Sequence, residues 1–344
     1  MIVALDMQLA VGNATGIGEY VLGLAPSLRD CGVEVIELCE PKLDPWRFDR
    51  RVVWDQVVLP QRARASNADL LHCACGTMPL RLTMPAVVTV HDVAWLRVQQ
   101  HTRPYARYYF GTFALQRYSH AAAIVVDSAF SRAELLEVLD VPSERVHVVY
   151  PGVAADYCGI ERRPSGEALV LVPGTVERRK NLEVLIRALT QLPKETKVIS
   201  VGPPTPYREE CERLATELSV RERIEFRGYV TRGELIDLYA RCALVAVPSR
   251  YEGFGYAAAQ ALCAGVPLVV SDASSLPEVA GSSAPLAGTD DDVQWAAEIA
   301  GILRDPARAQ AQAQAQRASA NARFAWQASA RAMRQVYETA LADG

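Results

Sequence analysis

The sequence predicts an α/β protein of two domains, each built on a doubly wound parallel sheet. Short apolar runs rich in β-branched residues alternate with helical patterns along the chain, which is typical of repeated strand–helix units. A polar stretch with turn residues, 158–167, separates two series of such units. The 344 residues suffice for two domains of ordinary size. We therefore predict domains at 1–160 and 166–325, with a terminal helix at 326–344 that can pack back on the first domain.

The predicted strands form one set on each side of the linker. The first set is 1–5, 33–38, 70–73, 86–90, 124–127 and 146–149, and the second is 169–172, 197–201, 224–226, 243–247 and 268–271. Ligands of such sheets bind beyond the carboxyl ends of the strands. We therefore expect the active site in a cleft between the two domains, lined by the loops that follow these strands.

Composition excludes several classes of protein. A net charge of −4 and a pI near 5.8 give no electrostatic footprint for nucleic acid. The eight cysteines show neither a CxxC pair nor a zinc-type spacing, so we expect reduced thiols. The first residues lack a basic signal-peptide region and no apolar run approaches 18 residues, which favours a cytoplasmic protein. The acidic run 290–292 suits the first turn of a helix, and we expect no metal site there.

The stretch 248–265 is the main candidate for a ligand site. Gly253 and Gly255 flank Phe254 between a predicted strand and a predicted helix, where unpaired backbone N–H groups can meet an anion such as a diphosphate. Three polar residues in the same stretch lie at helical spacing, Glu252, Tyr256 and Gln260. A loop carboxylate, a core tyrosine and a solvated glutamine would explain the same pattern equally well.

A basic loop opens the second domain. Arg178, Arg179 and Lys180 follow a predicted strand and precede a predicted helix. Cations at the start of a helix oppose its dipole unless an anion is present. The pattern therefore favours a clamp for a diphosphate over a solvated cluster of charges.

The first domain has two weaker candidates. Gly16 and Gly18 open a predicted helix after the first strand, but the glycine pattern is too short for a dinucleotide fingerprint, and a plain turn explains it as well. His91 and Asp92 follow the predicted strand 86–90, at the edge of the sheet where ligands bind. This place favours a functional histidine over a structural one.

The segment 97–120 combines four arginines and six aromatic residues with no carboxylate. Such a composition suits peripheral contact with an anionic membrane, on the inner face if the protein is cytoplasmic. A helix packed on one side and solvated on the other explains the segment at least as well.

Taken together, several segments resemble glycosyltransferase family 4, whose members are retaining enzymes of the GT-B fold with two Rossmann-like domains. The matching segments are 15–20, 90–92, 151–153, 174–182, 248–255 and 276–279, and they span nearly the whole chain. The resemblance implies a sugar nucleotide held mainly by the second domain, an acceptor held by the first, and no metal. The stretch 174–182 looks most like bacterial mannosyltransferases and deoxysugar transferases of surface polysaccharide assembly, which suggests a GDP-linked donor and a glycan or lipid-linked acceptor.

The resemblance also implies roles for single residues. Lys180 and Arg179 would neutralise the leaving diphosphate, Glu252 would hold sugar hydroxyls, and His91 would contact the sugar from the first domain. The other implied contacts with the sugar nucleotide are the backbone of Gly253, Phe254 and Gly255 at the phosphate and sugar, Gly16 and Gly18 near the diphosphate, and Gly228, Tyr229 and Val230 beside the base.

Three residues depart from the family pattern. Gln260 stands where a second carboxylate usually accepts hydrogen bonds from the ribose hydroxyls, Thr175 replaces an arginine, and Glu19 replaces a basic residue. The first two departures motivate a rival interpretation, a sugar-nucleotide-binding pseudoenzyme or scaffold. A third interpretation, epimerisation or hydrolysis of a sugar nucleotide, calls for an acid/base pair that the sequence does not offer.

Overall fold

The computed structural model describes residues 1–12, 16–98 and 104–342, and its chain divides into two compact units. Unit 1 comprises Met1–Gly152 and Phe324–Gly344, and unit 2 comprises Val153–Arg323. The division falls before the expected linker at 158–167. The reason is that helix α8 (Ala155–Cys158) belongs to unit 2, where the Tyr157 ring packs edge-on against Tyr239 with 5.4 Å between centroids.

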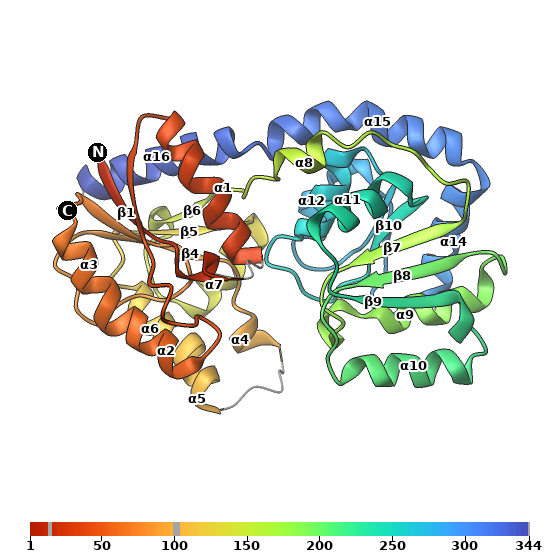
Figure 1. Cartoon of the computed structure of the whole chain (residues 1–344), viewed down its shortest axis with the longest axis horizontal. Coiled ribbons are helices and arrows are strands. Elements are labelled where there is room, and N and C mark those ends of the chain that lie inside the picture. The colour runs from red at the N-terminus through yellow and green to blue at the C-terminus, as the bar shows by residue number, and fades with distance from the viewer. Residues whose placement is uncertain (13–15, 99–103, 343–344) are drawn as a thin grey trace. The chain divides into compact units, whose positions relative to one another are not determined.

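Unit 1 contains a six-stranded parallel sheet in the order β2-β1-β3-β4-β5-β6 (Figure 1). The order reverses beside β1, because the chain goes first to one side of this strand and then to the other. Val3 and Leu5 of β1 enter the core on one face of the sheet, and Ala4 enters the core on the other. The strands are β1 (Ile2–Asp6), β2 (Glu34–Leu38), β3 (Leu70–Cys73), β4 (Ala86–Val90), β5 (Ala123–Val126) and β6 (Val146–Val148).

Helices cover both faces of this sheet, as expected for a buried parallel sheet. They are α1 (Gly16–Asp30), α2 (Phe48–Val53), α3 (Leu59–Ala65), α4 (Ala94–Arg97), α5 (Pro104–Arg107), α6 (Ala114–Tyr118), α7 (Ala129–Val138) and the C-terminal α16 (Trp326–Ala342). Two π-helical segments, η2 (Trp54–Val58) and η3 (Tyr108–Phe113), join α2 to α3 and α5 to α6.

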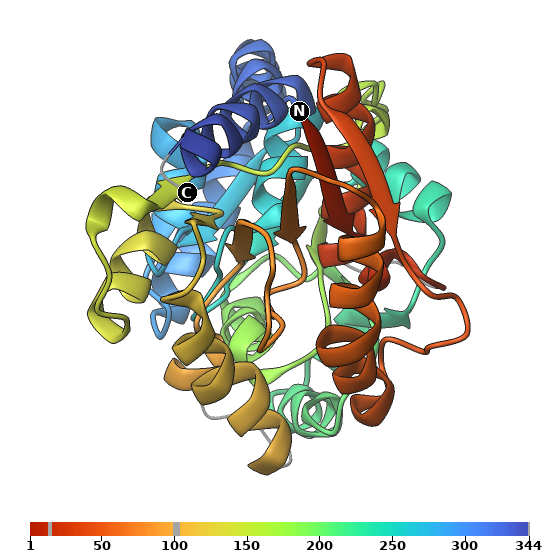
Figure 2. The same cartoon turned by 90° about the vertical axis from the view of Figure 1, so that its left-hand side faces the viewer.

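The C-terminal helix α16 packs beside α1 (Figure 1, Figure 2). Gly23 and Gly152 allow this close approach, because a Cβ atom at either position would overlap the indole of Trp326. Further along α16, the Tyr337 hydroxyl lies 2.6 Å from Nδ1 of the buried His72 on β3. The last helix of the chain thus completes the core of unit 1.

Unit 2 contains a second six-stranded parallel sheet in the order β12-β11-β10-β7-β8-β9. Counted from β7, this is the 3-2-1-4-5-6 order of the dinucleotide-binding folds, and the order reverses between β7 and β10. The predicted fold class, two doubly wound parallel sheets, is confirmed, although the prediction lacked the two-residue strand β12. The strands are β7 (Leu169–Pro173), β8 (Lys197–Val201), β9 (Ile224–Gly228), β10 (Leu244–Val247), β11 (Leu268–Ser271) and β12 (Leu286–Ala287).

The core of unit 2 gathers residues of α9, α10 and α14 against one face of the sheet, with Trp295 fully buried. The Ala/Gln-rich stretch forms α15, which packs on α12 through bonds from Arg317 Nε to Cys263 O (3.1 Å) and Gln310 Nε2 to Gly265 O (2.9 Å). Beyond α8, the helices are α9 (Leu182–Ala188), α10 (Tyr207–Glu217), α11 (Arg232–Arg241), α12 (Tyr256–Ala264), α13 (Leu276–Ala280), α14 (Asp292–Arg304) and α15 (Pro306–Arg323). Within the described ranges, no helix is long and apolar enough to cross a bilayer.

Candidate functional site

Two loops of unit 2 meet where the strand order reverses. The loop after β7 carries Arg179 and Lys180, and the loop after β10 carries Glu252. Lys180 Nζ donates to Glu252 Oε1 at 2.6 Å, and Arg179 donates to Glu252 Oε2 at 3.2 Å. A backbone bond from Arg250 N to Arg179 O, 2.8 Å long, joins the same loops. The two stretches that the sequence singled out, 174–182 and 248–255, therefore form one site at the position where such sheets bind ligands.

Glu252 is held rigidly in this site. Its side chain is 9% exposed, and Ser249 Oγ donates to Oε1 at 2.6 Å. Its backbone N–H donates to Ser274 Oγ at 2.9 Å, and Ser275 Oγ donates to its carbonyl at 2.9 Å. Burial opposes the charge of this carboxylate, but the neighbouring Lys180 and Arg179 prevail and lower the pKa of Glu252. The sequence analysis did not identify the three serines, because two of them follow a different strand.

The three consecutive cations of the basic loop do not act together. Arg179 also pairs with Glu177 at 2.6 Å, so it stays beside the site. Arg178 instead pairs with Glu210 and lies over the Tyr207 ring, 5.3 Å from its centroid. The expectation that Arg178 belongs to the clamp is wrong. The residues form a 3₁₀ turn, in which successive side chains diverge by about 120°.

Helix α12 begins at Tyr256, later than the predicted helical stripe requires. Gly255 has φ +94°, and a Cβ atom there would lie 2.7 Å from Leu276 Cδ2. Glu252 therefore lies in the loop, and the expected stripe with Tyr256 and Gln260 is wrong. Gln260 is on the helix, where its Oε1 accepts a hydrogen bond from Tyr239 OH at 3.2 Å.

Phe254, between the two glycines, faces the protein interior. Its side chain is 4% exposed and its ring packs edge-on against Tyr256, with 5.3 Å between centroids. The Phe254 carbonyl accepts a hydrogen bond from Ser275 Oγ at 2.8 Å, and contact of the backbone of Gly253, Phe254 and Gly255 with a ligand stays a prediction of the family resemblance. The φ of Gly255 and its contact with Leu276 explain that glycine without a ligand.

Asn181 links the two loops and was missed by the sequence analysis. It adopts a left-handed conformation with φ 55°, and its Nδ2 donates to Pro248 O (3.1 Å) and to Thr289 O (2.8 Å). Asparagine tolerates this conformation better than most residues, which is the one signal its sequence position carries. The side chain fastens the basic loop to the end of β10.

The residues expected beside the base lie along the same edge of the sheet. Gly228 ends β9 with φ +67°, and its carbonyl accepts a bond from Gly202 N at 2.8 Å. A Cβ atom at Gly202 would overlap the backbone of Gly174, so the ends of β7, β8 and β9 approach closely. Tyr229 follows with 70% exposure, and Val230 is partly buried.

A cavity of about 520 Å³ lies elsewhere in unit 2 and includes none of the candidate residues. Its lining includes Leu169, Lys197 and Ile224, which are the first residues of β7, β8 and β9. This is the amino edge of the sheet, opposite the edge at which doubly wound folds bind ligands. We therefore assign the functional site to the loops at the carboxyl edge.

In unit 1, His91 and Asp127 follow the neighbouring strands β4 and β5. His91 Nδ1 lies 2.7 Å from Asp127 Oδ2, and Nε2 lies 3.0 Å from the Ala74 carbonyl. Both ring nitrogens thus face acceptors, which favours the doubly protonated imidazolium. Burial opposes this charge, but Asp127 outweighs it and raises the pKa of His91. Asp127 was not identified from sequence, because the pairing of β4 with β5 became apparent only in the structure.

The glycines of the first domain lie at the start of α1. Gly16 is its first described residue and Gly18 is buried within it, whereas Thr15 lies outside the described residues. No atom of the described chain would lie within 4 Å of a Cβ at Gly16, so protein packing does not require glycine there.

The acidic run has structural partners. Asp291 caps α14 by accepting a bond from Gln294 N at 2.9 Å, and Asp290 pairs with Arg250 at 2.6 Å. Asp292 accepts a bond from Gln191 Nε2 at 2.8 Å.

Within the segment 97–120, residues 104–118 form one uninterrupted helical run with a π-helical middle, as expected for a helix packed on one side and solvated on the other. Residues 99–103, including Arg103, lie outside the described residues, and the rest comprises the end of α4, then α5, η3 and α6. Tyr109 and Tyr118 are buried, and Arg97 pairs with Glu134 at 3.2 Å and also with Glu137. The exposed part of the segment is therefore smaller than its composition suggested.

Two family profiles match adjacent parts of the sequence. The profile described as "Glycosyltransferase Family 4" matches residues 14–157, and the one described as "Glycosyl transferases group 1" matches residues 157–324. The chain belongs to glycosyltransferase family 4. The predicted family is thereby confirmed.

Two curated relatives of this family 4 chain are informative. The D-inositol 3-phosphate glycosyltransferase of Xylanimonas cellulosilytica is 32% identical over 63% of this chain and 57% of its own length. The O-antigen chain mannosyltransferase B of Escherichia coli is 30% identical over 66% of this chain and 63% of its own length. The matches thus span less than two thirds of either relative.

Solved structures share the GT-B fold. Sucrose-phosphate synthase from Thermosynechococcus elongatus superposes with a TM-score of 0.78, 22% identity and complete coverage of both chains. Anabaena HepE, solved in complex with UDP-glucose, superposes with a TM-score of 0.73 and 19% identity over 98% of this chain and 99% of its own.

Proposed function

We propose that this chain is a retaining, metal-independent glycosyltransferase. It would move a sugar from a nucleotide-sugar donor to a glycan or lipid-linked acceptor in surface polysaccharide synthesis. The observation that carries the proposal is the meeting of Lys180, Arg179 and Glu252 at the reversal of strand order in unit 2. Two cations beside a buried, oriented carboxylate suit a ligand with a diphosphate and sugar hydroxyls. Membership of the family and the names of its relatives support the same assignment.

The proposed reaction breaks the bond between the anomeric carbon and the diphosphate oxygen. The electron pair of that bond goes to the phosphate, and Lys180 and Arg179 stabilise the charge that develops there. The acceptor oxygen attacks the same face of the sugar, and its proton passes to the departing phosphate. No carboxylate pair is required. His91 is proposed to contact the transferred sugar, and as an imidazolium it would stabilise negative charge on the leaving group.

A GDP-linked sugar is the proposed donor. Its support is the resemblance of 174–182 to mannosyltransferases and the name of the Escherichia coli relative. A UDP-linked sugar is the alternative, supported by the ligand of Anabaena HepE. The residues beside the proposed base, Gly228 to Val230, present backbone and a tyrosine ring that either base can contact.

The test is a panel of GDP-, UDP- and ADP-sugars, scored by thermal shift and by slow donor hydrolysis in the presence of a chelator. The proposal predicts that one nucleotide sugar stabilises the chain and is turned over without metal, and that a GDP-sugar is the strongest. Stabilisation without turnover on any acceptor would favour the pseudoenzyme interpretation, which Gln260 motivates. The absence of a shift with every nucleotide sugar would contradict both.

A further inference from the structure

Two of the eight cysteines form a pair within unit 2. Cys158 ends α8 and Cys263 lies on α12, and these two helices pack on each other. The two thiols are hydrogen-bonded to each other. Cys158 is partly exposed, whereas Cys263 is fully buried. Because the two residues are far apart in the sequence, no spacing rule such as CxxC reveals the pair.

A single guanidinium group holds the backbone on both sides of this pair. Arg317 of α15 donates through Nε to the Cys263 carbonyl at 3.1 Å and through Nη2 to the Cys158 carbonyl. Nε and Nη2 belong to one rigid, planar group, so both carbonyls are held within its reach. Helices α8, α12 and α15 are therefore fixed around the two sulfur atoms, and the positive charge of Arg317 acts on the Cys158 thiol.

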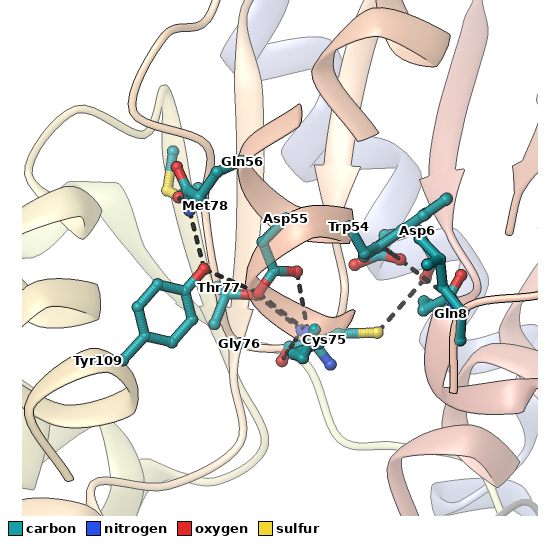
Figure 3. Close-up of polar contacts among 12 residues, drawn as sticks. Asp6, Gln8, Trp54, Asp55, Gln56, Cys75, Gly76, Thr77, Met78 and Tyr109 are labelled. Carbon is teal, nitrogen blue, oxygen red and sulfur yellow. Dashed lines mark hydrogen bonds and ion pairs between the residues drawn. The ribbon is translucent and has the colours of Figure 1, made fainter. Parts of the chain in front are cut away.

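Thiols outside the pair have a different environment. Figure 3 shows one of them, Cys75, whose Sγ donates to the Asp6 carbonyl at 3.7 Å inside a buried polar cluster. A thiol that stays protonated reacts slowly with oxidants, because the thiolate is the nucleophile. Burial raises the pKa of the following thiols and so keeps them protonated: Cys39, Cys73, Cys75, Cys211 and Cys242.

Cys158 has the opposite character. The hydrogen bond from Cys263 is the largest influence on the pKa of Cys158, and together with the charge of Arg317 it outweighs burial and lowers this pKa to about 7. The same hydrogen bond raises the pKa of Cys263, which is the donor. The pair thus combines an accessible thiolate with a neighbouring thiol that can react with its oxidised form. This is the arrangement found in redox-sensitive cysteines.

We propose that Cys158 and Cys263 are a redox-active pair, which a peroxide closes into a disulfide and a dithiol reopens. The Cys158 thiolate attacks one oxygen of hydrogen peroxide, the O–O bond breaks, and the sulfur becomes a sulfenic acid while the other oxygen leaves as hydroxide. The Cys263 sulfur then attacks Cys158 Sγ, and the S–O bond breaks. The departing hydroxide takes the proton of Cys263 and leaves as water. The two sulfur atoms together lose two electrons, which reduce the peroxide.

The disulfide would fasten α8 to α12. Helix α8 is the first helix of unit 2, and α12 follows the loop 253–255 and carries Gln260 one turn before Cys263. The cross-link encloses residues 158–263, and closing so long a loop restricts the unfolded chain more than the folded chain. This inference assumes nothing about the donor, so donor turnover tests the proposed function separately.

Treatment of the full chain with hydrogen peroxide tests the proposal without any substitution. We expect two of the eight thiols to become protected from alkylation, and peptide mapping under non-reducing conditions to join the peptides of Cys158 and Cys263. A dithiol should restore both thiols. The oxidised chain should melt roughly 5–10 °C higher than the reduced chain. An oxidised chain in which these two thiols stay free, or in which another pair is joined, would overturn the proposal.

Substitutions separate the roles of the two sulfur atoms. Cys263→Ser and Cys263→Ala should both stop the reaction at the sulfenic acid of Cys158, which dimedone traps. Serine still donates a hydrogen bond and alanine does not. Alkylation of Cys158 at neutral pH should therefore slow at least about fivefold in Cys263→Ala and less in Cys263→Ser.

Cys39→Ser is the matched control, because Cys39 is also partly exposed. This variant should keep the wild-type cross-link and the wild-type rate of alkylation at Cys158. Equal alkylation rates in Cys263→Ala and the wild type would contradict the hydrogen bond between the thiols. Loss of the cross-link in Cys39→Ser would show that the disulfide involves a different cysteine.

Discussion

Gln260 is the residue at which this chain departs most clearly from the family pattern. Its Oε1 already accepts a bond from Tyr239 OH, so one lone pair of a single uncharged oxygen is left for the two ribose hydroxyls. A carboxylate at the same place could accept from Tyr239 with one oxygen and from a ribose with the other. The local structure thus gives a reason why a glutamine here weakens nucleotide binding.

Gln260→Glu should bind the donor nucleotide at least as tightly as the wild type. The expected gain is up to about 1–2 kcal/mol, the difference between a charged and a neutral hydrogen bond. Titration calorimetry measures it, and Gln260→Leu, which offers no acceptor, should bind less tightly than either. A clear loss of affinity in Gln260→Glu would contradict this interpretation.

The carboxylate of Asp127 favours the charged form of His91 and raises its pKa. In Asp127→Asn the imidazolium loses its carboxylate partner, so the pKa of His91 should fall from its raised position towards or below the ordinary value near 6.5. Titration of the imidazole signals by nuclear magnetic resonance would follow this, since the chain has only five histidines. An unchanged His91 titration in the variant would show that Asp127 does not set its charge.

At the scale of elements, the basic loop depends on one backbone conformation. Asn181 adopts the left-handed conformation, and its side-chain amide donates hydrogen bonds to the carbonyls of Pro248 and Thr289. The contributions of the Asn181 side chain and of its backbone conformation to stability can be separated by substitution. Glycine adopts the left-handed conformation without strain but lacks the amide group.

Asn181→Gly should lose about 1–2 kcal/mol of unfolding free energy with the buried hydrogen bonds. Asn181→Ala should lose about 1 kcal/mol more, since alanine also strains at positive φ. Denaturant unfolding measures both, and donor affinity should fall in parallel because the loop carries Lys180. Equal stability of the two variants would contradict the role given to the left-handed conformation.

The sequence predicted this site at the level of elements and not in its internal geometry. Glycines, cations and strand ends located the loops 174–182 and 248–255, because these features reflect local conformation. The direction of Arg178 depends on a 3₁₀ turn, and the place of Glu252 depends on Gly255, which delays the start of α12 to Tyr256. Two of the serines that hold Glu252, Ser274 and Ser275, follow β11 and not β10, so only the sheet order reveals them.

At the scale of the whole chain, the C-terminal helix returns to the first sheet. The strands were predictable from apolar runs, apart from β12, whose two residues give no pattern. The units divide before the expected linker, because Tyr157 of the four-residue α8 packs against Tyr239 of unit 2, a contact that the local sequence does not indicate. The contact of Tyr337 with His72 joins residues 265 positions apart, which no local pattern predicts.

The burial of His72 makes the stability of the chain sensitive to acid. Burial lowers the pKa of His72 in the folded chain to about 3. In the unfolded chain the imidazole takes up its proton near pH 6.5, whereas in the folded chain it does so only near pH 3. As the pH is lowered between these two values, the contribution of His72 to the free energy of unfolding therefore falls by about 1.4 kcal/mol per pH unit. The raised pKa of His91 has the opposite effect, because its contribution to the free energy of unfolding is lost as the pH rises above 6.5. Urea unfolding across this range should show a shallower acid slope in His72→Gln, and equal slopes would contradict the assignment.

The central claim is that Lys180 neutralises the leaving diphosphate at the site in unit 2. The most direct measurement is kcat for turnover of the nucleotide sugar that the panel identifies, in Lys180→Ala and in Arg178→Ala, the adjacent cation that faces Glu210. We predict a loss on the order of 10²-fold or more in Lys180→Ala, with near wild-type turnover in Arg178→Ala. Near-normal turnover in Lys180→Ala, or equal losses in both variants, would contradict the claim.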